Sequence, residues 1–244
     1  MSFERNAPYA PTPDNRPQPV GDAPPALMRE ADTQMSFGER AAVEGLLGQL
    51  RPGLAVEIGT AEGGSLRRIC AHAAEVHSID VSHEPLGEAP GNATLHTGSS
   101  AELQPGLLES FAAKGRTVDF ALVDGDHSFE GVAGDLRALL ASPAARRTVI
   151  LVHDSTNAEV RAGIESVGLD SYPHVVYLEL DFVPGYVLRV GSAANTVWGG
   201  LALVVTGAER SPAYAESPRQ PLYYEPFEAL QRMRAERLGE ARHP

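Results

Sequence analysis

Carboxylate and imidazole side chains directly follow two apolar runs of the sequence. The runs are VDFALV, residues 118–123, and TVILV, residues 148–152. The side chains that follow them are Asp124, Asp126, His127, His153 and Asp154. Such groups bind divalent cations, with oxygen ligands favouring Mg²⁺, or act as general bases. If both runs are strands of one parallel sheet, their carboxyl ends share a rim, where open α/β folds bind ligands. The pattern predicts a metal site or a proton-accepting site there.

A glycine-rich segment follows an earlier apolar run, AVEI, at residues 55–58. The segment reads GTAEGGS and occupies residues 59–65. Its glycines permit a tight turn and a close backbone approach to a ligand, and a helix starting there offers free N–H groups that suit a carboxylate. The residues expected to contact a ligand here are Glu57, Gly59, Thr60, Gly63 and Ser65. The segment therefore predicts a ligand-binding loop.

The chemistry of the loop excludes two common nucleotide motifs. Ala61 stands where the dinucleotide fingerprint needs its second glycine, and no Gly-Lys-Ser/Thr of a P-loop follows. Glu57 and Glu62 disfavour a pyrophosphate and favour a ligand with positive charge. S-adenosylmethionine has a sulfonium, an ammonium, a carboxylate and a ribose, but no phosphate. Asp80 ends the run VHSID, where a carboxylate is placed to bind ribose hydroxyls.

The elements that position these residues alternate between short β-type runs and helix-length stretches. Expected strands cover residues 55–58, 76–79, 94–96, 118–123 and 148–152, and expected helices cover 64–74, 101–114, 129–141 and 156–168. Such alternation predicts βαβ units and a parallel sheet. After Pro173 the segments VVYLEL, GYVLRV and GGLALVV follow with no room for a helix, so we expect strands that close one edge, some of them antiparallel. The predicted fold is α/β and Rossmann-like: a seven-stranded, mostly parallel sheet with an antiparallel edge and helices on both faces.

One domain, residues 36–206, is expected between two tails. Ser36 and Glu39 have capping-box spacing and predict the start of a first helix. The proline-rich residues 1–35 are interpreted either as a disordered tail or as an arm that folds over a site. Residues 207–244 contain a predicted helix with one apolar side, expected to dock on the domain or on a sister subunit. That side carries Phe227, Leu230 and Met233.

Taken together, VEIGTAEGGSL, Asp80 and DFALVDGDHSFEGVAGDL resemble the class I S-adenosylmethionine-dependent methyltransferases. Within them, the chain is similar to bacterial small-molecule O-methyltransferases of the macrocin and aminocoumarin sugar type, over about residues 36–206. The resemblance implies that S-adenosylmethionine is the cofactor and that the acceptor is a hydroxyl of a sugar or other natural product. Ser99 lies where relatives contact adenine, although a helix cap is an equal alternative for this residue. Asp124, beside the glycine-rich loop, is expected to contact the cofactor as well.

The same resemblance assigns the rim residues. Carried over by position, Asp124 and Asp154 would hold Mg²⁺, and Asp126 would be the base. His153 departs from the pattern, because those relatives have another aspartate there; imidazole suits Mn²⁺, Fe²⁺ or Zn²⁺ better than Mg²⁺. The expected metal ligands are thus Asp124, His153 and Asp154. Asp126 and His127 are the two candidate bases, although Asp126 can instead cap the next helix.

Composition and net charge limit the classes of molecule that the protein is expected to bind. The formal net charge of −12 disfavours nucleic acid and anionic membrane surfaces, which leaves a small-molecule acceptor. No apolar run approaches the ~20 residues of a membrane span. Cys70 is the single cysteine, which excludes an intramolecular disulfide and fits a cytoplasmic protein.

Two other functions are open at this point. One is a hydroxylase resembling the cephalosporin hydroxylases, with iron at His153 and Asp154. The other is a non-catalytic protein that binds an adenosyl ligand.

Overall fold

A computed structural model describes residues 34–188 and 196–208. The expected C-terminal helix with Phe227, Leu230 and Met233 lies outside the described residues, as does the proline-rich arm up to residue 33. Within the described part of the chain, no helix is long and apolar enough to cross a membrane.

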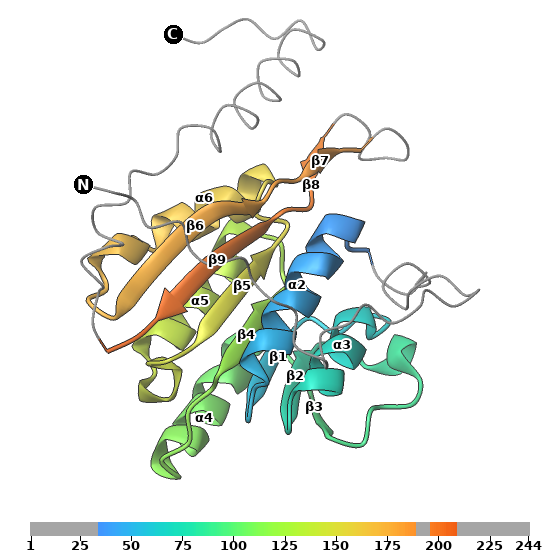
Figure 1. The fold of residues 1–244 in the computed structure, drawn as a ribbon, viewed down its shortest axis with the longest axis vertical. Coiled ribbons are helices and arrows are strands. Elements are labelled where there is room, and N and C mark those ends of the chain that lie inside the picture. Colours follow the sequence, from blue (N-terminus) through green and yellow to red (C-terminus); the bar gives the residue numbers. More distant parts are fainter. Residues whose placement is uncertain (1–33, 189–195, 209–244) are drawn as a thin grey trace, which may run out of the picture.

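A seven-stranded sheet forms the centre of the domain, in the order β3-β2-β1-β4-β5-β9-β6 (Figure 1). The first five strands in sequence are parallel. They are β1 (Ala55–Ile58), β2 (Val76–Asp80), β3 (Ala93–Thr97), β4 (Phe120–Val123) and β5 (Val149–His153). The strand β9 (Leu201–Thr206) pairs antiparallel with β5 and with β6 (Val175–Val183). The predicted parallel sheet with an antiparallel edge is confirmed.

Helices cover both faces of this sheet (Figure 1). The helices α2 (Phe37–Leu50) and α3 (Gly64–His72) lie on one face, and α4 (Ser100–Ala113), α5 (Phe129–Ala141) and α6 (Ala158–Ser166) lie on the other. Three short 3₁₀ turns, η2 (Glu84–Leu86), η3 (Pro143–Ala145) and η4 (Leu169–Ser171), lie between the elements. Strand β4 is buried along its whole length because alternate residues enter the two apolar cores.

Local sequence explains where α2 begins. The Ser36 hydroxyl accepts a hydrogen bond from the Glu39 backbone N–H at 3.3 Å, and the Glu39 carboxylate accepts one from the Ser36 N–H. This reciprocal pair satisfies two N–H groups that the helix itself cannot. The predicted capping box is confirmed.

The segment GYVLRV departs from the prediction. Its described part forms β7 (Tyr186–Val187), which pairs with β8 (Val197–Trp198) in a separate two-stranded sheet rather than at the edge of the main one. Pro184 has no N–H to continue a ladder, and Gly199 and Gly200, at φ of 71° and 85°, separate β8 from β9. The small sheet thereby stands beside the carboxyl ends of the parallel strands (Figure 1).

Candidate functional site

A cavity of about 500 Å³ opens at the carboxyl ends of the parallel strands. It is bordered by the glycine loop (residues 59–65), the tip of β2, the turn before α4, the first turns of α5 and the tips of β4 and β5. The predicted glycine loop and the predicted rim residues therefore face one space.

Backbone conformation shapes the glycine-loop end. Gly59 has a φ of 91°, and a Cβ there would lie 2.1 Å from the backbone oxygen of Asp124. Gly63, the N-cap of α3, has a φ of 81° and no side chain to cap the helix. Gly64 and Ser65 in the first turn of α3 line the cavity. The N–H groups of that turn suit an anionic group of a ligand.

Asp80 connects this loop to β2. Its Oδ2 accepts hydrogen bonds from the backbone N–H groups of Thr60 at 2.6 Å and Ala61 at 3.1 Å, and its Oδ1 accepts one from Ser82 at 3.0 Å. Burial raises the pKa of Asp80, but these N–H groups and His83 outweigh burial and hold the pKa below its usual value. Asp80 is therefore an ionised carboxylate that both orders the loop and lines the cavity.

Glu57 lies behind the loop and is not among the described residues that line the cavity. Its Oε2 accepts a hydrogen bond from the Ser78 hydroxyl at 2.6 Å, and Ser78 in turn lies 2.6 Å from the Thr60 hydroxyl. Burial raises the pKa of Glu57 to about 8. Glu57 is then mostly protonated at neutral pH, so its position gives it a supporting role for Thr60 rather than a negative charge for the ligand.

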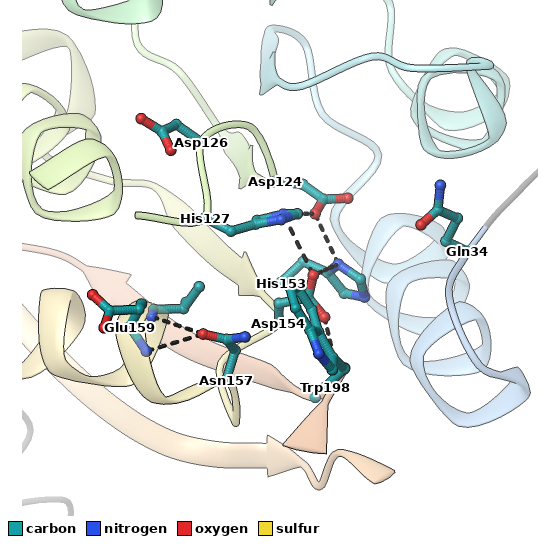
Figure 2. Close-up of polar contacts among 12 residues, drawn as sticks. Gln34, Asp124, Asp126, His127, His153, Asp154, Asn157, Glu159 and Trp198 are labelled. Carbon is teal, nitrogen blue, oxygen red and sulfur yellow. Dashed lines mark hydrogen bonds and ion pairs between the residues drawn. The ribbon is translucent and has the colours of Figure 1, made fainter. Parts of the chain in front are cut away.

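Three side chains form the rim cluster, which we define as Asp124, His127 and Asp154. Each offers one metal-ligating atom, and these atoms all lie within 4.8 Å of one another (Figure 2). The Nε2 of His127 is 3.4 Å from Asp124 Oδ1 and 3.4 Å from Asp154 Oδ2. The hydrogen bond to Asp124 raises the pKa of His127, and the nearby charge of Asp154 adds to this.

His153 borders the cavity, but its imidazole is only 5% exposed and lies between two carboxylates. Its Nδ1 donates to Asp124 Oδ1 at 2.8 Å, while its Nε2 lies 3.3 Å from Oε1 of Glu39 (Figure 2 shows the Asp124 contact). Burial lowers the pKa of this imidazole, but Asp124 and Glu39 outweigh burial and raise it well above its usual value. Among the described residues, the cluster of potential metal ligands contains His127 where the sequence predicted His153.

The backbone holds Asp154 in an uncommon conformation. Its φ is 53°, in the left-handed region that aspartate tolerates better than most residues. Its Oδ1 accepts a hydrogen bond from the Gly199 N–H at 2.6 Å, which leaves Oδ2 facing His127. Burial raises the pKa of Asp154, whereas burial of Asp124 is outweighed by His153 and His127, so the pKa of Asp124 is lowered.

Asp126, one of the two predicted candidate bases, borders the cavity but lies outside the rim cluster. Its carboxylate points away from Asp124 and His127 (Figure 2). Asp126 Oδ1 accepts a hydrogen bond from the Ser128 N–H at 2.9 Å, and the Ser128 hydroxyl accepts one from Gly131 N–H at 3.1 Å. The two residues order the start of α5, which is the capping role considered above as the alternative.

Three further residues lie around the site. Trp198 packs its ring edge-to-face against His127, with ring centroids 5.8 Å apart. Glu39 is fully buried. The sequence predicted it only as a capping residue. No sequence signal links Glu39 to His153, because α2 reaches the rim through tertiary packing. Ser99, the N-cap of α4, lines the cavity as expected for a residue near the cofactor.

Comparison with known families agrees with this geometry. Residues 56–155 match the family model described as a methyltransferase domain. This segment contains the glycine loop, Asp80 and the rim cluster. Over these residues, the chain is similar to methyltransferase domains.

Solved structures support the same fold. An O-methyltransferase from Bacillus cereus in complex with SAH is 19% identical, with 72% of this chain and 84% of that chain covered and a TM-score of 0.50. The O-methyltransferase TomG from Streptomyces achromogenes, in complex with SAM, is 15% identical, with 73% and 83% covered and a TM-score of 0.52. A putative hemolysin from Streptococcus thermophilus is 14% identical, with 83% and 74% covered and a TM-score of 0.53. No curated protein matches significantly.

Proposed function

We propose that this domain transfers the methyl group of S-adenosylmethionine to a hydroxyl oxygen of a small-molecule acceptor. The observation that carries the proposal is one cavity that joins the glycine loop to the rim cluster. The structures from B. cereus and S. achromogenes, with SAH and SAM, are described as O-methyltransferases, which supports the cofactor and the type of acceptor atom. The net charge of −12 favours a small molecule over RNA as acceptor.

The glycine-loop end provides the groups that such a cofactor needs. N–H groups at the start of α3 suit the methionine carboxylate. The ionised Asp80 suits the ribose hydroxyls, because each carboxylate oxygen can accept more than one hydrogen bond. The short turn at Gly59 brings this end close to Asp124, so the methyl-bearing sulfur would lie toward the rim cluster.

The rim cluster would activate the acceptor. A neutral alcohol is a poor nucleophile, so the enzyme must hold its oxygen in line with the methyl group and accept its proton. The imidazole of His127 is 36% exposed, whereas that of His153 is only 5% exposed and faces two carboxylates. In its neutral form, His127 is thus the better-placed acceptor of the hydroxyl proton, and Asp124 and Asp154 would stabilise its charged form.

A divalent cation also fits this cluster. Asp124, His127 and Asp154 would hold it, and their mixed nitrogen and oxygen donors suit Mn²⁺ or Fe²⁺ in addition to Mg²⁺. A bound cation would lower the pKa of the acceptor hydroxyl. His127 would then be a ligand instead of the base, so the two versions of the proposal differ in their need for metal.

The test uses the full-length protein, S-adenosylmethionine and panels of polyols and phenols, with S-adenosylhomocysteine formation as the readout. Cofactor-product binding is measured separately by calorimetry. We expect binding of S-adenosylhomocysteine and turnover with at least one hydroxyl acceptor. Full turnover after treatment with excess chelator would remove the metal from the mechanism and leave His127 or Asp126 as the base. Loss of turnover that Mg²⁺ or Mn²⁺ restores would establish the need for a metal. A folded protein that binds no S-adenosylhomocysteine would overturn the proposal.

A further inference from the structure

Asp135 is a buried carboxyl group that no step above uses. It belongs to the second turn of α5 and is 2% exposed, yet it borders the cavity. Its Oδ2 is buried and has no hydrogen-bond partner. A buried carboxylate oxygen without a donor is costly, so such an atom in a cavity wall indicates that a ligand supplies the donor.

The surroundings of Asp135 leave room for a planar ring. The cavity wall here consists of small residues, which are Ser99, Ser100 and Ala101 before and within α4, and Gly131 and Gly134 of α5. A Cβ at Gly134 would meet nothing within 4 Å. The side-chain amide of Gln104 donates to the Asp135 backbone oxygen at 3.1 Å and ties α4 to α5. A side-chain hydrogen bond from Ser100, the first residue of α4, reaches the Asp135 carboxyl group itself.

The order of the strands indicates which part of the ligand reaches this wall. Asp80 ends β2, and β3 is the next strand outward in the sheet. The turn after β3, at Gly98 and Ser99, lies on the same cavity as Asp135. With the ribose at Asp80, the base attached to that ribose would extend between this turn and α5.

We propose that Asp135 accepts a hydrogen bond from the exocyclic amino group of the adenine ring and so selects a 6-amino purine over a 6-oxo purine. This inference rests on the proposed cofactor. Burial raises the pKa of Asp135 to about 6, so at pH 8 its carboxylate is ionised and can only accept. A 6-oxo purine would place an acceptor oxygen against it, and neither group could supply a proton.

The experiment compares two probes on each protein by calorimetry at pH 8: S-adenosylhomocysteine and its deaminated analogue, S-inosylhomocysteine. We expect the unmodified protein to prefer the adenine probe by roughly 10- to 150-fold, the range for a hydrogen bond to a charged group. Asp135→Ala should reduce this preference to about threefold or less. The ratio within one protein isolates the contact, because a general loss of packing would weaken both probes alike.

Two further variants complete the test. Glu109→Gln changes an exposed carboxylate of the neighbouring helix α4 that is not among the residues lining the cavity, and it should keep the original preference. Asp135→Asn preserves the size of the side chain and should reduce the preference for the adenine probe, because the amide can donate to the 6-oxo group. This variant tests the contact if Asp135→Ala does not fold. An unchanged preference in the folded Asp135 variants would overturn the inference. Failure of the unmodified protein to bind S-adenosylhomocysteine would overturn the proposed cofactor instead.

Discussion

The two ends of the cavity are constructed from different parts of the chain. At the glycine-loop end, backbone turns at Gly59 and Gly63 shape the site, and a single side chain, Asp80, orders them. At the other end, the rim cluster is made of side chains from the tips of β4 and β5, with contacts from the turn after β8. At the glycine-loop end, almost no substitution of the glycines is tolerated. At the rim cluster, by contrast, one side chain can take over the role of a neighbouring one.

Gly59→Ala is expected to have the largest effect. Its Cβ would meet the Asp124 backbone at 2.1 Å, and backbone atoms cannot move aside as a flexible side chain can. We expect binding of S-adenosylhomocysteine to be lost in calorimetry, with a large drop in melting temperature. Gly115→Ala is the matched control: its φ is 64° but its surroundings are open, so it should cost only about 1–2 kcal/mol and leave binding intact. Normal binding by Gly59→Ala would show that the turn is not rigid.

The pair His127→Ala and Asp126→Asn tests the side-chain end. Because His127 lies in the rim cluster and Asp126 caps a helix, we expect His127→Ala to lower kcat by ~10²–10⁴-fold. Asp126→Asn, an exposed substitution, should change kcat by only about twofold. Both are measured at saturating cofactor. The reverse order of effects would assign the role of base to Asp126, the other candidate that the sequence predicted.

Asp80→Ala is expected to act on binding alone. Loss of a charged hydrogen-bond partner should weaken S-adenosylhomocysteine binding by roughly 10- to 150-fold, with kcat at saturating cofactor nearly unchanged. Asp119→Ala is a suitable control, since this carboxylate also holds backbone N–H groups, those of Gly53 and Leu54, but before β1. It should lower stability without changing affinity. Equal affinity losses in both variants would show that Asp80 acts only through general stability.

The smallest expected effect is the pH dependence of stability from Glu57. Its pKa is raised from 4.5 to about 8 in the folded protein, so its contribution to stability is fully present below pH 4.5 and is lost as the pH rises through 8. The slope cannot exceed about 1.4 kcal/mol per pH unit. Urea unfolding between pH 5 and 8 should show a shallower decline for Glu57→Gln than for the unmodified protein. Glu62→Gln, an exposed substitution in the adjacent glycine loop, should follow the unmodified protein. Parallel curves for all three proteins would contradict the prediction.

The structural features that the sequence predicted correctly are those that depend on a few neighbouring residues. The start of α2 at Ser36, the five parallel strands and the glycine turn at Gly59 all follow from patterns of a few residues. The small β7–β8 sheet was not predicted, because apolar content cannot tell a main-sheet strand from a short hairpin when Pro184 and the Gly199–Gly200 turn interrupt it.

The partners at the rim were less predictable for a different reason. Asp126, His127 and His153 lie at or just after the ends of strands, and their spacing gives no information on which imidazole is exposed and which is enclosed between carboxylates. That choice depends on Glu39, which occupies the Nε2 side of His153 from a distant helix. Asp126 follows β4 as closely as its neighbours do, but its local hydrogen bond to Ser128 turns it away.

The contact of Glu39 with Gly200 has a consequence for how the domain folds. The Glu39 carboxylate accepts a hydrogen bond from the Gly200 N–H across 161 residues of sequence. The preceding residue, Gly199, donates its N–H to the Asp154 carboxylate. Contacts of such long range form late, because a long loop must close first. A nascent chain that has emerged only as far as β5 would already contain the glycine loop, Asp80 and the rim side chains, yet Asp154 would lack its anchor. Catalytic competence would thus arise in the last step of folding, after the parallel sheet is complete.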